Sequence, residues 1–206
     1  MLKNLLLVLL IIGTSSILAQ DRAELIFRDG SSLEGLAKIN KKDEVVFRKT
    51  SNDKRTVYNH RQIKELVIFK DSLVKTYNYK MVNKAGKGNQ FQLLRKPIIK
   101  GKVNLYYKMK KVSYNNFHTP IGVTGPPFLE VYYLSKDQEN SVTYLHTAKP
   151  NSRKFKKIAE EYFSDCPELM SKINANEFKA VEFSLKKSQD DGIIQIVNYY
   201  NDKCFK

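Results

Sequence analysis

Residues Phe91–Lys111 read FQLLRKPIIKGKVNLYYKMKK, and their pattern predicts a β-strand with two unlike sides. Side chains of a strand point alternately to opposite faces of its sheet. One side then carries Val103, Leu105, Tyr107 and Met109, and the other carries Lys102, Asn104, Tyr106, Lys108 and Lys110. We expect the first side to be buried beneath helices that follow later in the chain. The second side is expected to be an exposed row of lysines beside Tyr106.

The first part of this stretch is predicted to be a less regular strand. Pro97 has no backbone N–H to donate to a sheet ladder, so Phe91–Ile99 is expected at an edge or a bulge. A glycine inside a strand pattern marks a bend, and we expect one at Gly101.

Positive charge is concentrated around the same stretch. Residues 71–118 hold eleven Lys and Arg against one acid, a net charge of +10 out of +15 for the whole chain. Residues 21–70 carry +4, and residues 119–206 are neutral. We interpret the excess as a candidate surface for an anionic ligand, made of Lys100, Lys102, Tyr106, Lys108, Lys110 and Lys111. The alternative is a solvated strand face whose lysines protect a sheet edge from aggregation.

Residues 1–19 are predicted to be a signal peptide. Lys3 gives a positive start, Leu5–Ile12 is an unbroken apolar run, and Ala19 stands at the expected cleavage site. That run would span roughly 12 Å as a helix, much less than the roughly 30 Å of a bilayer core. We therefore expect export and no transmembrane segment after signal cleavage. The mature chain is expected to be periplasmic or secreted, or held peripherally on the outer membrane.

Residues 20–70 have the spacing of a small antiparallel barrel or meander. Short runs separated by turn residues lie at Ala23–Arg28, Ser32–Ile39, Val45–Lys49, Arg55–Tyr58 and Ile63–Phe69. The segment AELIFRDGSSLEGLAKI resembles the opening of SH3-like and Sm-like small barrels, and Gly35 fits the sharp bend of their second strand. The resemblance implies shape alone.

Residues 71–150 are predicted to form an antiparallel sheet with a basic face, and residues 151–206 a helical cap. Leu73–Val82 alternates, and a hairpin is expected from Phe128–Leu134 and Ser141–Thr147. After Pro150 the apolar spacing becomes helical. Helices are expected after Asn151 or Ser152, from Pro167, over Glu177–Lys187 and after Asp190-Asp191. The fold class is therefore predicted to be α+β.

The two cysteines, Cys166 and Cys204, both lie in the part expected to be exported. An oxidising compartment favours a single disulfide between them, which would tie the second of these helices to the last. Two buried free thiols are the alternative.

Motifs of several enzyme and metal-binding classes are missing from the sequence. There is no G-x-S-x-G, C-x-x-C or H-E-x-x-H, and the three histidines, His60, His118 and His146, are far apart along the chain. The Gly-rich turn at Ala85–Asn89 lacks the Lys followed by Ser or Thr of a P-loop. His118 stands beside the Gly/Pro loop HTPIGVTGPP and is the candidate for a functional imidazole. We expect no metal site and no cofactor.

Three short motifs carry a resemblance over most of the mature chain. They are Gly101–Tyr107, Asp165-Cys166-Pro167 and the ending Tyr200-Asn201-Asp202-Lys203-Cys204, a YNxxC-type motif. With the signal peptide and the β-rich N-terminal part, this layout resembles a group of uncharacterised exported proteins of Bacteroidetes bacteria. The resemblance implies export and fold, and it implies no activity.

The sequence favours an exported, non-enzymatic protein that binds an anionic envelope component through its basic sheet face. Anionic lipid, lipopolysaccharide and acidic glycan are the expected classes of ligand, because nucleic acid fits an exported chain less well. One alternative is an envelope enzyme that uses His118 and the Gly/Pro loop. Another is a structural module that docks an envelope protein by strand addition at the Pro97 edge.

Overall fold

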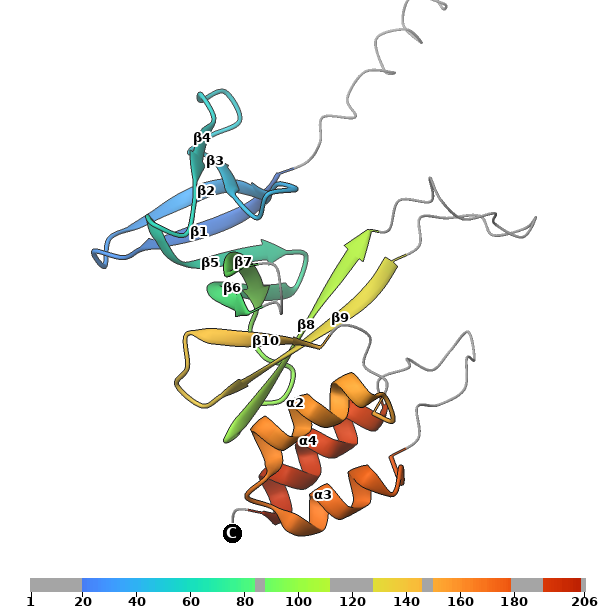
Figure 1. Cartoon of the computed structure of the whole chain (residues 1–206). Coiled ribbons are helices and arrows are strands. Elements are labelled where there is room, and N and C mark those ends of the chain that lie inside the picture. Colours follow the sequence, from blue (N-terminus) through green and yellow to red (C-terminus); the bar gives the residue numbers. More distant parts are fainter. Residues whose placement is uncertain (1–19, 84–87, 112–127, 146–149, 179–190, 205–206) are drawn as a thin grey trace, which may run out of the picture. The chain divides into compact units, whose positions relative to one another are not determined.

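The structure is a computed structural model, and it describes residues 20–83, 88–111, 128–145, 150–178 and 191–204. The chain divides into two units, Met1–Lys75 and Thr76–Lys206, with the division inside one strand. The described residues form ten strands and three helices, so the predicted α+β class is confirmed (Figure 1). Within them, no helix has the length and apolar character needed to cross a membrane.

The first unit is a meander whose strands match the predicted runs. β1 (Asp21–Phe27), β2 (Ser32–Ile39), β3 (Val45–Arg48), β4 (Thr56–Tyr58) and β5 (Ile63–Lys70) follow the order β4-β3-β2-β1-β5. Each pairing is antiparallel, and the described strands do not close into a barrel.

Buried hydrophobic side chains from several strands form the core of the first unit. Its members are almost free of solvent exposure: Ala23, Leu25, Ala37, Val45, Phe47, Ile63, Leu66 and Ile68. Gly35 lies in β2 where the chain is crowded, because a Cβ atom there would stand 2.5 Å from the Arg48 carbonyl oxygen and 2.6 Å from the Phe47 ring. A glycine in a strand can mark such a close approach of backbone and neighbours, and Gly35 does so here.

The second unit contains a mixed sheet in the order β7-β6-β10-β9-β8. Its strands are β6 (Leu73–Asn83), β7 (Gln90–Arg95), β8 (Val103–Lys111), β9 (Phe128–Lys136) and β10 (Ser141–Leu145). The β10–β6 pairing is parallel, which differs from the antiparallel expectation, while β7–β6, β10–β9 and β9–β8 are antiparallel.

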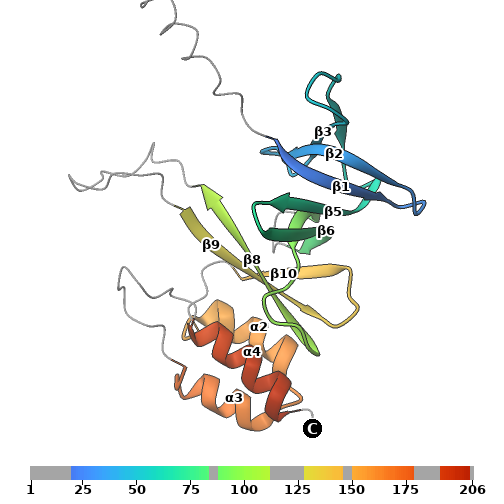
Figure 2. The same ribbon diagram turned by 180° about the vertical axis from the view of Figure 1, so that it is seen from behind.

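Three helices follow the sheet. They are α2 (Arg153–Phe163), α3 (Pro167–Asn174) and α4 (Asp191–Lys203), and they form one group in both views (Figures 1 and 2). Ser152 caps α2 by accepting a hydrogen bond from the Phe155 N–H, and Pro167 opens α3 as predicted. The helix predicted over Glu177–Lys187 falls mostly outside the described residues.

The helices bury one side of the sheet in a set that we call the helix-side core. Val103 and Leu105 of β8 belong to it, as predicted, and both are fully buried. The other buried members come from β9, β10 and the helices: Tyr132, Leu134, Leu145, Phe155, Ala159, Tyr162, Phe163, Cys166, Leu169, Ile173, Ile193, Ile196, Val197 and Tyr200.

The opposite side of the sheet is also buried, which corrects the prediction of an open outer face. Tyr106 is only 6% exposed. It packs with a second group that we call the β7-side cluster, whose other buried members are Val82, Leu94, Val131, Tyr133 and Val142. The physical reason is that Val82 of β6 and Leu94 of β7 pack over this side of β8.

Two further residues of β8 depart from the predicted alternation. Met109 was expected in the core but is 48% exposed, because the helix-side core reaches only Val103, Leu105 and, in part, Tyr107. Asn104 was expected to be exposed but is 5% exposed, and its side-chain oxygen accepts a hydrogen bond from the Gly101 N–H at 3.3 Å.

Candidate functional site

The exposed positive charge of the central stretch gathers on the loop between β7 and β8, residues Lys96–Lys102, which we call the basic loop. Its three lysines, Lys96, Lys100 and Lys102, are exposed. Ile98 stands among them with 43% of its surface exposed. The loop therefore presents three cations and one apolar side chain to solvent.

Hydrogen bonds to β8 hold the middle of the basic loop. The Ile98 N–H donates to the Leu105 carbonyl, and the Leu105 N–H donates to the Ile99 carbonyl at 2.9 Å. These bonds fix the backbone around Pro97 although the proline cannot donate one itself.

A side chain from the end of α4 holds the other end of the loop. The Asn201 amide donates to the Val103 carbonyl at 2.9 Å, and its oxygen accepts from the Val103 N–H at 3.0 Å. Gly101 lies against this amide so closely that a Cβ atom there would stand 2.5 Å from Asn201 Cγ. The bend predicted at Gly101 thus makes room for the Asn201 anchor.

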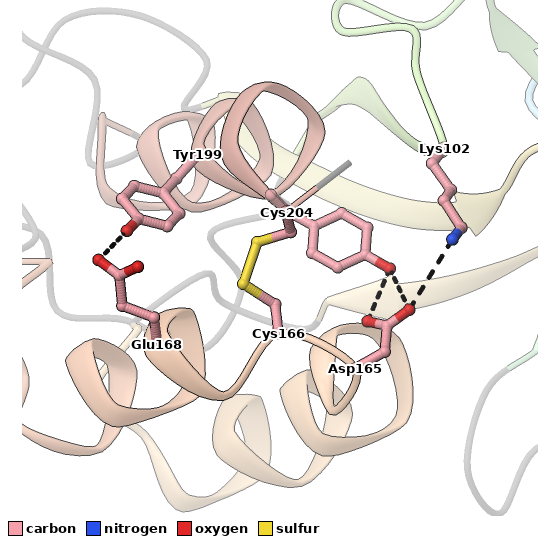
Figure 3. The surroundings of a disulfide bond; sticks show 7 residues. Lys102, Asp165, Cys166, Glu168, Tyr199 and Cys204 are labelled. Carbon is pink, nitrogen blue, oxygen red and sulfur yellow. Dashed lines mark hydrogen bonds and ion pairs between the residues drawn. A yellow bond between two sulfur atoms is a disulfide. The ribbon is translucent and has the colours of Figure 1, made fainter. Parts of the chain in front are cut away.

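Lys102 leads from the basic loop into a polar cluster shown in Figure 3. Its Nζ lies 3.9 Å from an Asp165 carboxylate oxygen. The buried Tyr200 hydroxyl is placed between the two Asp165 oxygens, at 2.9 and 3.0 Å, and donates to this carboxylate. Burial, reinforced by the Asp165 carboxylate, raises the pKa of the Tyr200 phenol well above its usual range.

The helices of this cluster are cross-linked. The sulfur atoms of Cys166 and Cys204 are 2.06 Å apart and the Cα atoms 5.7 Å apart, so the predicted pair stands at disulfide distance. The bond joins the residue before α3 to the residue after α4 (Figure 3). Beside it, Tyr199 donates a hydrogen bond to the Glu168 carboxylate, which ties the same two helices a second time.

A cavity of about 320 Å³ opens where Lys102 and Asp165 meet the sheet, and we call it the α2–β9 cavity. Its floor is formed by the buried residues Val103, Tyr162 and Tyr200. Its rim consists of exposed polar and charged side chains: Lys102, Lys136, Asp137, Glu161, Ser164 and Asp165.

Tyr162 is the fixed point of this floor. Its hydroxyl donates to the Leu134 carbonyl at 3.1 Å and lies 2.9 Å from Thr143 Oγ1. Burial raises the pKa of this phenol to about 12, so it is neutral at physiological pH. The Lys136 ammonium lies 5.9 Å from the centre of the same ring, within the range of a cation–π contact.

The predicted anion-binding residues do not form one surface. Lys100 and Lys102 are exposed on the basic loop, Lys108 is half-buried on β8, and Tyr106 lies in the β7-side cluster. Burial raises the pKa of the Tyr106 phenol. Lys110 and Lys111 belong to β8, but their side chains lie outside the described residues.

Sequence reasoning missed the residues that join the basic loop to the helices. Lys96 was not selected, although it stands next to Pro97. Asn201 and Asp165 were quoted only as parts of motifs, yet one anchors the loop and the other meets Lys102. For Asn201 and Asp165 the sequence offered one signal, because each lies within three residues of a cysteine.

The residues considered for catalysis are mostly beyond the described chain. His118 and its Gly/Pro loop, with His146, lie outside it. His60 belongs to the first unit, where burial and the neighbouring charges of Arg61 and Arg28 lower its pKa. No group of three or more His, Cys, Asp or Glu side chains suited to a metal ion occurs among the residues that the structure describes.

Comparison with protein-family models, curated proteins and solved structures finds no match to this chain. The functional argument therefore rests on the residues themselves.

Proposed function

We propose that this is an exported, non-enzymatic protein that binds an anionic surface of the cell envelope through the basic loop. One observation carries the proposal: three exposed lysines and an exposed isoleucine share a short loop that the fold holds at two points. A loop already held in place loses little conformational entropy when it binds.

Charge alone gives this loop a useful but moderate affinity. Each lysine close to an anionic membrane contributes about 1 kcal/mol, so three contribute about 3 kcal/mol, or roughly a hundredfold in binding. Ile98 favours a lipid surface over an acidic glycan, because an apolar side chain gains free energy only when it leaves water. Anionic lipid, including lipopolysaccharide, is therefore the ligand we propose, and acidic glycan is an outcome to test.

Export is part of the proposal. The pattern of residues 1–19 supports a cleaved signal peptide, and the Cys166–Cys204 pair suits an oxidising compartment. Mass spectrometry of the protein purified from an envelope-containing fraction should find a chain that starts at Gln20. A chain that retains Met1 in the cytoplasm would contradict export.

Binding is tested by sedimentation with vesicles of phosphatidylcholine, with and without phosphatidylglycerol or lipopolysaccharide. We expect binding only with the anionic lipid, with a loss of about tenfold or more when Lys96, Lys100 and Lys102 are changed to Gln. A matched control changes three exposed lysines of the first unit, Lys41, Lys42 and Lys54, to Gln.

The control removes the same net charge, so it separates the loop from the overall basicity of the chain. Equal losses in the two triple variants would sink the proposal for the basic loop. Binding to an acidic polysaccharide with no binding to anionic vesicles would replace lipid by glycan as the ligand.

A further inference from the structure

The rim of the α2–β9 cavity holds opposite charges that do not meet. Lys136 contributes a cation, and Asp137 and Glu161 contribute two anions. Within the described residues, none of these three side chains forms a salt bridge, and the Lys136 ammonium stands over the Tyr162 ring instead. The two signs of charge thus share one cavity and leave space between them.

The ion pair between Lys102 and Asp165 at this rim is long and exposed. Lys102 and Asp165 are 3.9 Å apart, with side chains 50% and 52% exposed. An exposed pair of this length contributes little to stability, so Lys102 can contact a ligand at small cost in this pair. Asp165 keeps its position meanwhile, because the Tyr200 hydroxyl holds both carboxylate oxygens.

The floor of the cavity positions one cation of the protein, the Lys136 ammonium. The Tyr162 ring is fixed by the hydrogen bond of its hydroxyl to the Leu134 carbonyl, and it already lies under the Lys136 ammonium. The face of a tyrosine ring attracts an ammonium group, so the ring helps to hold the Lys136 ammonium where it can meet the anionic group of a ligand. The volume of about 320 Å³ is at the small end of ligand pockets.

We propose that the α2–β9 cavity binds a small zwitterion, with a primary ammonium at one end and a phosphate or carboxylate at the other. The ammonium meets Glu161 and Asp137, and the anionic group meets Lys136 and Lys102. The rim carries three acids and two lysines, so a plain anion is repelled by the acids and a plain cation is repelled by the lysines.

This site goes beyond the proposed surface binding and does not require it. Only Lys102 belongs to both, since Lys96 and Lys100 of the basic loop do not line the cavity. The ligand chemistry has two sources, the headgroup of an ethanolamine lipid and a free small molecule.

The test is a titration of the isotope-labelled protein, followed by the amide NMR signals of Val103, Asp137 and Asp165. The probe is O-phosphoethanolamine, with inorganic phosphate, ethanolamine and phosphocholine as partial analogues and glycine as the carboxylate analogue. We expect saturable shifts with O-phosphoethanolamine. Phosphate, ethanolamine and phosphocholine should each bind with an affinity at least about tenfold weaker. Tight binding of glycine would extend the site to carboxylates and support it.

Two matched pairs of variants locate the site. Glu161→Gln should weaken O-phosphoethanolamine binding by about tenfold, while Glu160→Gln, one residue earlier and outside the cavity, should not. Lys136→Gln should weaken it similarly, with Lys154→Gln on α2 as its control. No saturation up to about 10 mM, phosphate as tight as the zwitterion, or equal effects within a pair would overturn the proposal.

Two further arms keep this proposal separate from the surface proposal. The double variant Lys96→Gln with Lys100→Gln should weaken binding to phosphatidylglycerol vesicles and leave the O-phosphoethanolamine titration unchanged. Glu161→Gln should weaken binding in the O-phosphoethanolamine titration and leave binding to the vesicles unchanged. Loss of the titration in the double lysine variant would contradict a distinct cavity site. If phosphatidylethanolamine vesicles compete with O-phosphoethanolamine for the cavity and phosphatidylcholine vesicles do not, the ligand is the lipid headgroup. If neither kind of vesicle competes, the ligand is the free small molecule.

Discussion

The first part of β8, Val103–Tyr106, is closed to solvent on both sides, but by different means. On one side the helix-side core brings together sixteen buried residues from three strands and three helices, with a disulfide at its edge. On the other side six buried residues form the β7-side cluster, with no helix among its members. The same strand therefore has a large, cross-linked support on one side and a small one made of strands on the other.

Buried hydroxyl groups are hydrogen-bonded on both sides, by Tyr162 and Tyr200 in the helix-side core and by Tyr133 in the β7-side cluster. In the β7-side cluster the Tyr133 hydroxyl, which is fully buried, donates to Gln92 Oε1 at 3.0 Å. Lys80 lies with its ammonium 6.0 Å from the Tyr106 ring and donates to the Glu139 carbonyl at 2.8 Å. Burial lowers the pKa of this lysine, against the effect of nearby Glu139. A small cluster can thus include tyrosine and lysine if their polar ends are satisfied.

The largest effect is expected from breaking the cross-link on the helix side. Changing both Cys166 and Cys204 to Ser removes a cross-link between residues 38 positions apart in the sequence. In the chain-entropy model this lowers the free energy of unfolding by about 4 kcal/mol. The free energy of unfolding is measured with urea, following tyrosine fluorescence. Reduction of the unaltered protein with dithiothreitol is the chemical control and should give the same loss.

A loss of less than about 1 kcal/mol in the free energy of unfolding of the double variant would contradict the view that the cross-link distinguishes the helix side. Such a result would mean that packing, rather than the cross-link, holds α3 and α4 against the sheet. Hydrogen exchange in the same variant should rise in α3 and α4 and stay unchanged in β6 and β7, since the disulfide touches only the helix side.

Sequence pattern predicted the helix side well because large apolar residues at helical or strand spacing have one satisfactory place. Val103 and Leu105 were found this way. The helix starts came from local signals, a cap at Asn151 or Ser152, of which Ser152 is the cap, and a first turn at Pro167. The cysteine pair was named because two residues allow only one intramolecular bond.

The same reasoning failed on the β7 side because Tyr106 and Asn104 suit water and protein equally well. Whether such residues are buried depends on which other segments cover them, and alternation within β8 says nothing about the packing of β6 and β7 on Tyr106. The basic loop was missed as a unit for a related reason, since its anchor Asn201 is 98 residues away from Val103.

The next effect compares equal truncations on the two sides. Leu105→Ala and Leu94→Ala each remove one almost fully buried leucine side chain, the first from the helix-side core and the second from the β7-side cluster. We expect a loss of about 3–4 kcal/mol for Leu105→Ala and about 2–3 kcal/mol for Leu94→Ala. The smaller value reflects a cluster of fewer residues, which can close over a cavity more easily. Urea unfolding of both variants measures the difference, and a larger loss for Leu94→Ala would reverse our ranking of the two sides.

The third effect appears only at high pH. Burial raises the pKa of Tyr162 from 10.0 to about 12, so below pH 10 the phenol is neutral in both the folded and the unfolded chain. Between these values the unfolded chain loses the proton and the folded chain keeps it, so the free energy of unfolding falls as pH rises through this window. The full shift is equivalent to about 2–3 kcal/mol. Tyr162→Phe should therefore flatten the fall between pH 10 and 12 in urea titrations, and an unchanged slope would contradict this assignment.

The smallest effect tests the anchor between the helix side and the basic loop. Asn201→Ala removes both hydrogen bonds to Val103 and should cost about 1–2 kcal/mol, because one buried backbone N–H and one carbonyl lose their partners. Amide exchange should speed up at Val103, while the exposed neighbour Asp202→Ala should leave it unchanged. Because Leu94 and Tyr106 do not touch Asn201, the β7-side cluster should keep its protection. If Asn201→Ala lowered the amide protection of the helix-side core and of the β7-side cluster equally, the position of the basic loop would depend on the whole of β8 and not on the last turn of α4.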